Sequence, residues 1–151
     1  MELGRHDSSL TRALKAGLTG AVVLTVAHET LRRLRSDAPR MDIVGKRAFK
    51  RVWRRFGGRP PRGRSLYGAT LAADLLTNTA YYAAFLLGRA NRPWIRQSAA
   101  GLAAGVGALA LPPVIGLGFA PKSYRRTNRF LTIGLYLLGG LTAAAAYRRL
   151  A

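Results

Sequence analysis

Hydrophobic residues in this chain are gathered into long runs, and charged residues stand mostly at the ends of these runs. With their flanking residues, four runs cover positions 13–33, 66–87, 98–119 and 130–147. Each is close to the roughly 20 apolar residues with which a helix crosses the hydrocarbon core of a bilayer. We therefore expect an all-α integral membrane protein, in which a bundle of about four transmembrane helices forms a single domain over residues 1–151.

The first run is the least apolar of the four. Lys15 lies near its start, and His28, Glu29 and Arg32 close it. A spanning helix fits if Lys15 and Arg32 extend their charged ends to opposite interfaces, and we expect this arrangement. A helix that lies flat in the interface is the alternative, and the sequence leaves it open.

A pair of prolines interrupts the third run. Pro112 and Pro113 have no N–H, and a proline ring crowds the carbonyl four residues earlier. The helix is therefore expected to kink or stop near Leu111. Inside a membrane the freed backbone groups need protein or water as partners, so this face should be buried in the bundle or line a wet cavity.

The segment between the first two runs has a different pattern. Residues 31–65 hold 13 of the 25 basic residues, and positions 39–56 form a helix with an apolar and a basic side. The apolar side consists of Met41, Val44, Ala48, Phe49, Val52, Trp53 and Phe56, and the basic side of Lys46, Arg47, Lys50, Arg51 and Arg54. Such a helix, with aromatic residues on its apolar face, is typical of the lipid headgroup region. We expect the five basic side chains to bind anionic headgroups.

The net charge of +19, from 25 Lys+Arg against 6 Asp+Glu, indicates an acidic partner. Anionic lipid and nucleic acid both fit the sign of this charge. Lipid is the better fit because most of the basic residues lie between apolar runs, where they act as topology signals. Nucleic acid is the less favoured partner.

The same basic residues predict which ends of the helices face the cytoplasm. With four spans, 17 of the 25 basic residues lie on one side, in positions 31–65 and 121–129, and eight lie on the other. Cytoplasmic loops carry the excess of Lys and Arg, so segment 34–65 should be cytoplasmic and both termini outside. Without a first span, the N-terminus would be cytoplasmic as well.

Asp74 is the one acidic residue inside the second run. A carboxylate near the middle of a bilayer costs about 2.5–3.5 kcal/mol, so it should face the bundle or water. Thr70, Asn78 and Tyr81 share its helix face. This polar stripe is either a proton, ion or polar-ligand site or a structural clasp between helices.

His28 and Glu29 belong to a second polar group at the end of the first run, with Thr25 and Arg32 on the same face. Histidine titrates near neutral pH, which makes His28 a candidate proton shuttle. A partly hydrated ion pair between Glu29 and Arg32 explains the same residues without any activity. We favour the ion pair.

Patterns that point to metal, cofactor or covalent chemistry are missing from the sequence. It has no Cys and two His, at positions 6 and 28, which lack the spacing of a metal site. Its glycines lie largely in apolar runs rather than in a phosphate-binding loop. We therefore expect no catalytic residue, no cofactor and no metal. Gly101 and Gly105, four positions apart, instead predict close contact between helices.

The stretch at 99–121 is a glycine-spaced apolar helix followed by the sequence Leu-Pro-Pro-Val-Ile-Gly-Leu-Gly. It resembles the corresponding region of YagU-type small bacterial inner-membrane proteins. The resemblance covers little more than one helix. It implies a bacterial inner membrane, and it transfers no functional residue to this chain.

These observations favour a small non-enzymatic multi-pass membrane protein, a subunit or scaffold that its basic helix anchors to the anionic cytoplasmic leaflet. It would pack against further copies of itself or a partner membrane protein. The alternative is an oligomeric transporter or channel component that uses the polar stripe around Asp74. An enzyme that acts on lipid through His28, Glu29 or Asp74 is the least supported hypothesis, because few polar groups converge.

Overall fold

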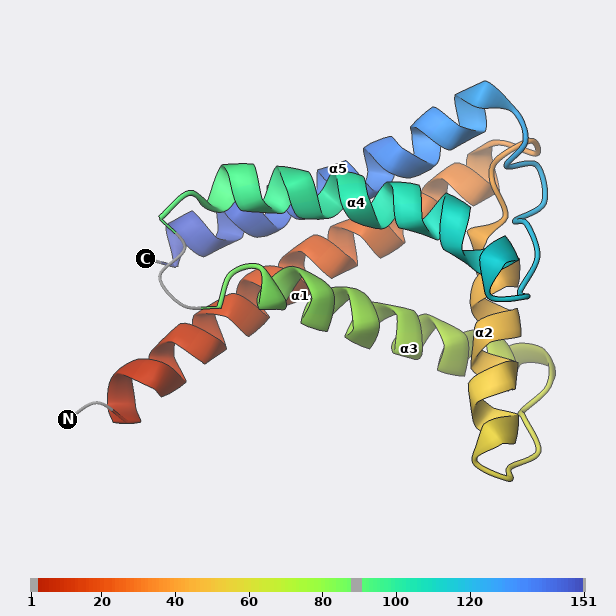
Figure 1. Cartoon of the computed structure of the whole chain (residues 1–151), viewed down its shortest axis with the longest axis horizontal. Coiled ribbons are helices and arrows are strands. Elements are labelled where there is room, and N and C mark those ends of the chain that lie inside the picture. Colours follow the sequence, from red (N-terminus) through yellow and green to blue (C-terminus); the bar gives the residue numbers. More distant parts are fainter. Residues whose placement is uncertain (1–2, 88–90, 151) are drawn as a thin grey trace.

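The computed structural model describes residues 3–87 and 91–150, and these residues form five helices and no strand (Figure 1). The helices are α1 (Leu3–Leu34), α2 (Met41–Arg55), α3 (Gly63–Ala84), α4 (Pro93–Val114) and α5 (Arg126–Arg149). The predicted all-α class is confirmed. Each predicted helical segment overlaps one of these helices, with ends that differ by up to ten residues.

Four helices lie side by side in the order α3, α1, α5, α4, and each is antiparallel to its neighbour (Figure 1). Between α1 and α5, the Arg12 guanidinium donates to the Tyr147 carbonyl at 2.8 and 2.9 Å. Helices α3 and α4 stand at the two edges of the row, and they make only a weak contact with each other, near one end. There the Tyr81 hydroxyl donates to the Ala100 carbonyl at 2.9 Å. Toward the other end α3 and α4 diverge.

Small residues let the helices approach closely where they cross. A Cβ placed on Gly20 of α1 would lie 2.5 Å from the Gly139 carbonyl oxygen of α5. On α4, a Cβ on Gly101 would lie 2.8 Å from Leu137 Cα, and one on Gly105 would lie 2.7 Å from Ile133 Cα. The predicted contact through Gly101 and Gly105 is therefore confirmed. Such approach provides packing energy where lipid supplies no hydrophobic drive between helices.

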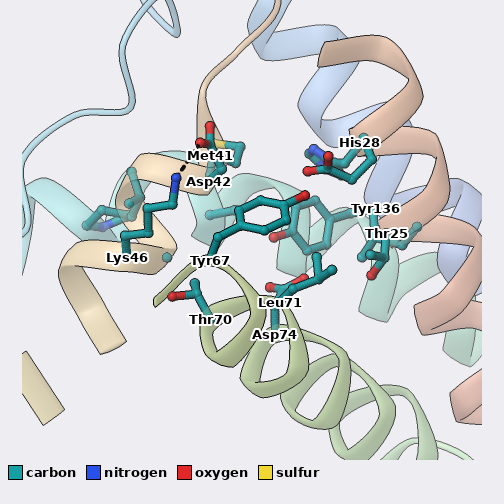
Figure 2. A pocket seen from close by; sticks show the side chains of 16 residues that line it. Thr25, His28, Met41, Asp42, Lys46, Tyr67, Thr70, Leu71, Asp74 and Tyr136 are labelled. Atoms are coloured by element: carbon teal, nitrogen blue, oxygen red, sulfur yellow. Dashed lines mark hydrogen bonds and ion pairs between the residues drawn. The ribbon is translucent and has the colours of Figure 1, made fainter. Parts of the chain in front are cut away.

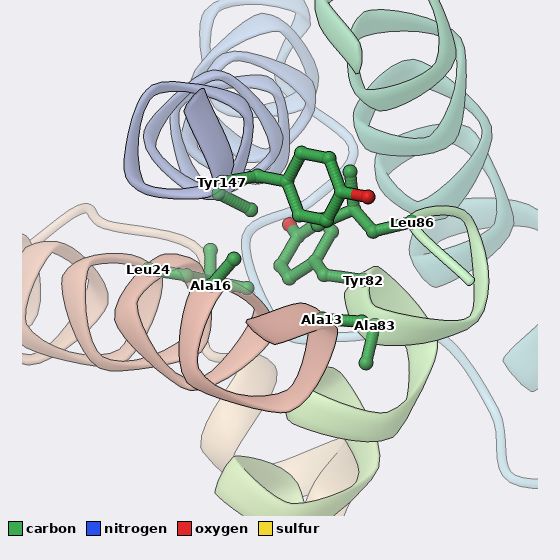
Figure 3. Close-up of a cluster of buried hydrophobic side chains, with 8 residues drawn as sticks. Ala13, Ala16, Leu24, Tyr82, Ala83, Leu86 and Tyr147 are labelled. Carbon is green, nitrogen blue, oxygen red and sulfur yellow. The ribbon is translucent and has the colours of Figure 1, made fainter. Parts of the chain in front are cut away.

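The interior of the row combines small side chains with a few large ones. Figure 3 shows Tyr82 and Leu86 against Ala13 and Ala16 of α1 and Tyr147 of α5. Tyr82 is fully buried, and its hydroxyl donates to the Tyr136 carbonyl at 2.7 Å. A buried tyrosine usually needs such a partner, and here the bond joins α3 to α5.

Large apolar side chains lie on the outside. On α1, Leu14, Leu18, Val22 and Val26 form an outward stripe, each between 42% and 58% exposed. Further exposed residues include Ile95, Val106 and Val114 on α4 and Phe130 on α5. Extensive exposed apolar surface is rare on soluble monomers. Small residues inside and large apolar residues outside are the distribution of a protein dissolved in lipid.

Three helical segments are long and apolar enough to cross a membrane: Ser9–Leu34, Pro93–Val114 and Arg126–Arg149. The chain is accordingly a helical membrane protein. The segment predicted as a span at 66–87 is not among the three. Its helix α3 contains Asp74, Asn78 and four threonine or serine residues from 65 to 79 among its apolar residues, which lowers its hydropathy. By length and composition, the described helices therefore support three membrane spans and not the four that the sequence predicted.

Helix α2 lies across the end of the row at a steep angle to the other helices (Figure 1). Gly45 allows it to sit over α3, since a Cβ there would lie 3.2 Å from Thr70 Cγ2. The loops at the same end are joined by hydrogen bonds from Arg40 N–H to the Pro121 carbonyl (3.1 Å) and from the Asn128 side chain to the Asp37 carbonyl (2.7 Å). This end is called the polar end below.

Helix α4 contains Pro112 and Pro113 in its last turn and ends at Val114. Of the two outcomes predicted near Leu111, a stop is wrong, because the helix continues for three more residues, and a kink stays a prediction. Prolines remove the hydrogen bonds to the carbonyls of residues 108 and 109, but their fixed φ is helical, so the turn continues. Gly116, with φ +74°, then reverses the chain.

Candidate functional site

A cavity of about 230 Å³ lies at the polar end, where all five helices contribute to its wall (Figure 2). Its polar lining residues are Thr25, His28, Glu29, Asp42, Lys46, Tyr67, Thr70, Asp74 and Tyr136. The rest of the lining is apolar, with Leu24, Leu71 and Ala108 among the residues. An engineered cavity of about 150 Å³ in another protein binds benzene, so this one has room for a small ligand.

Two buried polar atoms at this cavity have no hydrogen-bond partner among the described residues. They are Thr25 Oγ1 and His28 Nε2, both on α1. The His28 ring meets the Tyr136 ring edge to face, with ring centres 5.7 Å apart. Buried polar atoms are usually satisfied, so these two atoms beside the cavity are exceptions.

Two carboxylates of the lining already have cationic partners. Arg32 donates to Glu29 at 2.6 Å, and Asp42 accepts from Arg40 at 2.8 Å and from Lys46 at 3.2 Å. Burial raises the pKa of Asp42, but the hydrogen bonds from Arg40 and Lys46 outweigh burial, so its pKa lies below the ordinary value. These two groups are therefore neutralised within the protein.

Asp74 has no such partner. Of the four acidic side chains that the structure describes, Glu29, Asp37 and Asp42 form ion pairs and Asp74 forms none. Its neighbour on the next turn is Asn78, whose amide donates to the Asp74 backbone carbonyl at 3.0 Å. The Asp74 side chain is exposed, and it lines both the cavity and the groove between α2 and α3.

No protein-family model, curated protein or solved structure matches the chain. The resemblance of residues 99–121 to YagU-type proteins stays a prediction. What the cavity binds must therefore be argued from the residues that line it.

The fold brings the two predicted polar groups together. Thr70 and Asp74 from α3 lie at the same cavity as His28 and Glu29 from α1 (Figure 2). The other members of the stripe lie further from the polar end. Asn78 is buried in the bundle, and Tyr81 bonds to α4 through Ala100. The expected ion pair between Glu29 and Arg32 is present.

The sequence did not indicate three further residues of the lining as site residues. Tyr136 lies in the middle of an apolar run, and a polar hydroxyl in that position is the signal that was available. Tyr67 lies near the start of an apolar run, where aromatic residues are common at the membrane interface, yet its ring centre lies 5.3 Å from Lys46 Nζ and the ring faces the cavity (Figure 2). Asp42 lies in the first turn of α2, where an acidic residue is common and does not by itself indicate a site.

The prolines of α4 also bear on the cavity. Pro112 lines it together with Ala108. Because Pro112 has no N–H, it cannot donate to the Ala108 carbonyl four residues earlier. The sequence predicted a buried or cavity-lining face at this point, and Pro112 is in fact buried.

A second hollow, of about 360 Å³, lies on the opposite, basic side of α2. It is lined by Arg47, Lys50, Arg51, Arg54, Gly116 and Leu117. Arg47 donates to the carbonyls of Leu117 at 3.0 Å and Phe119 at 3.2 Å, and Arg51 donates to that of Ile115. This hollow holds four of the five predicted headgroup-binding residues. Lys46 lies instead at the first cavity, paired with Asp42.

Proposed function

We propose that the chain is a small non-enzymatic multi-pass membrane protein, a subunit or scaffold, whose polar end binds anionic phosphate headgroups. The observation that carries the proposal is the basic hollow on α2. Four cationic side chains line it, and no carboxylate is among its lining residues. Clustered Arg and Lys at a membrane surface bind anionic lipid.

The four cations divide into two roles. Arg47 and Arg51 hold the turn at 115–119 through its carbonyls. Lys50 and Arg54 form no hydrogen bond or ion pair with the described residues, so their donors are available to a phosphate. Guanidinium and ammonium groups both bind phosphate oxygens well.

The other side of α2 supports a position at the membrane surface. Val52, Trp53 and Phe56 are between 44% and 87% exposed. Exposed aromatic residues on an amphipathic helix insert among lipids at the headgroup level while its basic side faces the phosphates. This is the interfacial placement expected for residues 39–56.

The connectivity also supports a fourth crossing. Since α1 and α4 are parallel, α1 ends at the polar end and α4 begins at the opposite end. The chain between them must return, and α3 does so packed along α1. In our proposal α3 also crosses the membrane, because its packing against α1 offsets its limited hydropathy. Segment 34–65 then lies in the cytoplasm of a bacterial cell, and both termini lie outside.

The test is lipid retention by the purified full chain, measured by native mass spectrometry from mixed phosphatidylglycerol and phosphatidylcholine. We expect preferential retention of phosphatidylglycerol. The variant Lys50→Gln/Arg54→Gln should weaken it by about 2 kcal/mol, or roughly 30-fold, at about 1 kcal/mol per charge. The control Arg148→Gln/Arg149→Gln removes two exposed charges from the other end of the bundle and should retain phosphatidylglycerol as before.

Free phosphate is a second source of the same chemistry. Added glycerol phosphate that displaces the lipid would show that the headgroup alone is recognised, whereas no displacement would show that the acyl chains are needed. Equal retention of both lipids by the wild-type chain, or equal loss in both double variants, would contradict the proposal.

Transport is the second candidate function, and the cavity at Asp74 favours it. A channel or transporter needs polar groups inside the membrane part of the bundle, and here they converge from four helices. Five short helices enclose little volume, so further copies would complete the path. Solute flux into proteoliposomes that disappears in Asp74→Asn would support this function, and flux equal to empty liposomes would count against it.

A further inference from the structure

We propose that the cavity at the polar end, which all five helices line, is a binding site for a small organic ammonium ion with an apolar body. The inference does not depend on lipid binding by α2, nor on transport. It concerns which ligand the cavity takes, and binding measures it directly.

The first argument is charge. The chain has 25 Lys+Arg against 6 Asp+Glu, so cationic partners for an acidic residue are abundant. Nevertheless, Asp74 is left without an ion pair, while the other described acidic residues have one. The one cation in the lining, Lys46, is already paired with Asp42. The cavity therefore has one carboxyl group without a cationic partner, and an anionic ligand would find no free cation there.

The second argument is the supply of hydrogen-bond acceptors. Besides the Asp74 carboxylate, two residues of the lining each have a buried side-chain atom without a partner, Oγ1 of Thr25 and Nε2 of His28. A neutral His28 has one acceptor nitrogen. An ammonium group with several N–H donors complements such a lining, because each donor can meet a separate acceptor.

The third argument is the shape and chemistry of the remaining wall. Tyr67 from α3 and Tyr136 from α5 present aromatic rings to the cavity (Figure 2). Aromatic faces attract cations. Leu24, Leu71 and Val44 supply apolar surface for the body of the ligand. A bare proton or metal ion would need neither the volume of about 230 Å³ nor the aromatic rings.

The experiment is calorimetric titration of the full chain in detergent micelles with 2-phenylethylammonium. Its neutral counterpart, 2-phenylethanol, has a hydroxyl in place of the ammonium group. The variant Asp74→Asn keeps the shape of the side chain and removes its charge. The matched control is Asp37→Asn, the same change at an acidic residue outside the cavity. Thermal unfolding of each variant checks that it is folded.

We expect saturable binding of the ammonium ion to the wild-type chain and to Asp37→Asn. Binding should weaken by about tenfold or more in Asp74→Asn, because a charge pair is lost. The alcohol should bind at least about tenfold more weakly than the ammonium ion to the wild-type chain, and equally to the wild-type chain and Asp74→Asn. Absence of saturable binding, equal affinity in Asp74→Asn, equal loss in Asp37→Asn, or no preference over the alcohol would each overturn the proposal.

Discussion

Gly20 lies where α1 crosses α5, and the space there admits no side chain. A Cβ on this residue would approach the Gly139 carbonyl oxygen to 2.5 Å and the Ala143 Cβ to 2.9 Å. Neither neighbour can move independently, since one is backbone and the other is fixed to it. Gly134 on α5 differs from Gly20, because a Cβ placed on Gly134 would have no atom within 4 Å.

The substitution Gly20→Ala should therefore destabilise the bundle. We expect a loss of about 1–3 kcal/mol in the free energy of unfolding, the usual effect of overpacking. Gly134→Ala is the control, and it should leave stability unchanged or raise it by up to about 1 kcal/mol, because alanine is the better helix former. Unfolding in mixed micelles measures both. Equal effects of the two substitutions would show that the crossing is not tightly packed.

The residues that the sequence could and could not predict differ in a physical way. Contact through Gly101 and Gly105 follows from spacing on one helix, which sequence states directly. The meeting of His28 and Asp74 at one cavity depends on which helices are neighbours and on their register, and no local pattern encodes either. Lys46 was predicted on the basic face, but its ion pair with Asp42 places it at the cavity, and this pair has the local i, i+4 spacing that a sequence does show.

Among the elements, α2 was predicted as an amphipathic helix, and the structure shows how ion pairs fix its first turn. Its first turn is tied down by Asp42, which accepts from Arg40 and Lys46. Because these bonds lower the pKa of Asp42 below its ordinary value, folding favours the ionised carboxylate. Such a group stabilises the fold above its ordinary pKa and loses that contribution as the pH falls through the lowered folded pKa.

Acidification should therefore loosen α2. We expect a change in Trp53 fluorescence as the pH falls below about 4, the usual range for an aspartate. Replacing the other tryptophan, as in Trp94→Phe, isolates the signal. Asp42→Asn in this background should remove the step and show the loosened state at neutral pH. An unchanged pH profile in Asp42→Asn would mean that other groups hold the helix.

Helix α3 was predicted correctly as a helix, but its hydropathy is lower than that of a membrane span. Its position along the chain was predicted to within a few residues, since long runs with few charges form helices in lipid. Its hydropathy was overrated, because one carboxylate and the amide of Asn78 count heavily against partition into hydrocarbon. What offsets them is tertiary: Asn78 is buried and α1 covers one side of the helix.

At the scale of the whole molecule, the basic loops gather at one end. Segments 35–40 and 115–125 bond to each other there, as the alternation of helices requires. The sequence could predict this grouping from the order of apolar runs alone. It could not predict that α2 folds across the same end and closes the cavity, because that depends on the contact of Gly45 with Thr70.

Sidedness gives a direct test, helped by the absence of native Cys from the sequence. Ser65→Cys, Asn91→Cys and Thr127→Cys replace exposed, uncharged residues. An impermeant thiol reagent should label positions 65 and 127 only from the cytoplasmic side and position 91 only from outside. Labelling of positions 65 and 91 from the same side would contradict a crossing by α3. Reversed labelling of all three would contradict the orientation.

The limited hydropathy of α3 has a consequence for how the protein is made. In the proposed topology, α3 emerges after α1 and α2 and before α4 and α5, so α1 is the one membrane-crossing neighbour available when α3 inserts. The pair must therefore hold together as a hairpin, through Gly17 against Thr79 and Ala83, before α5 arrives to cover the other side of α1. In this sense α1 acts as an insertion guide built into the chain, and mutations on its α3-facing side should reduce the yield of inserted protein more than its final stability.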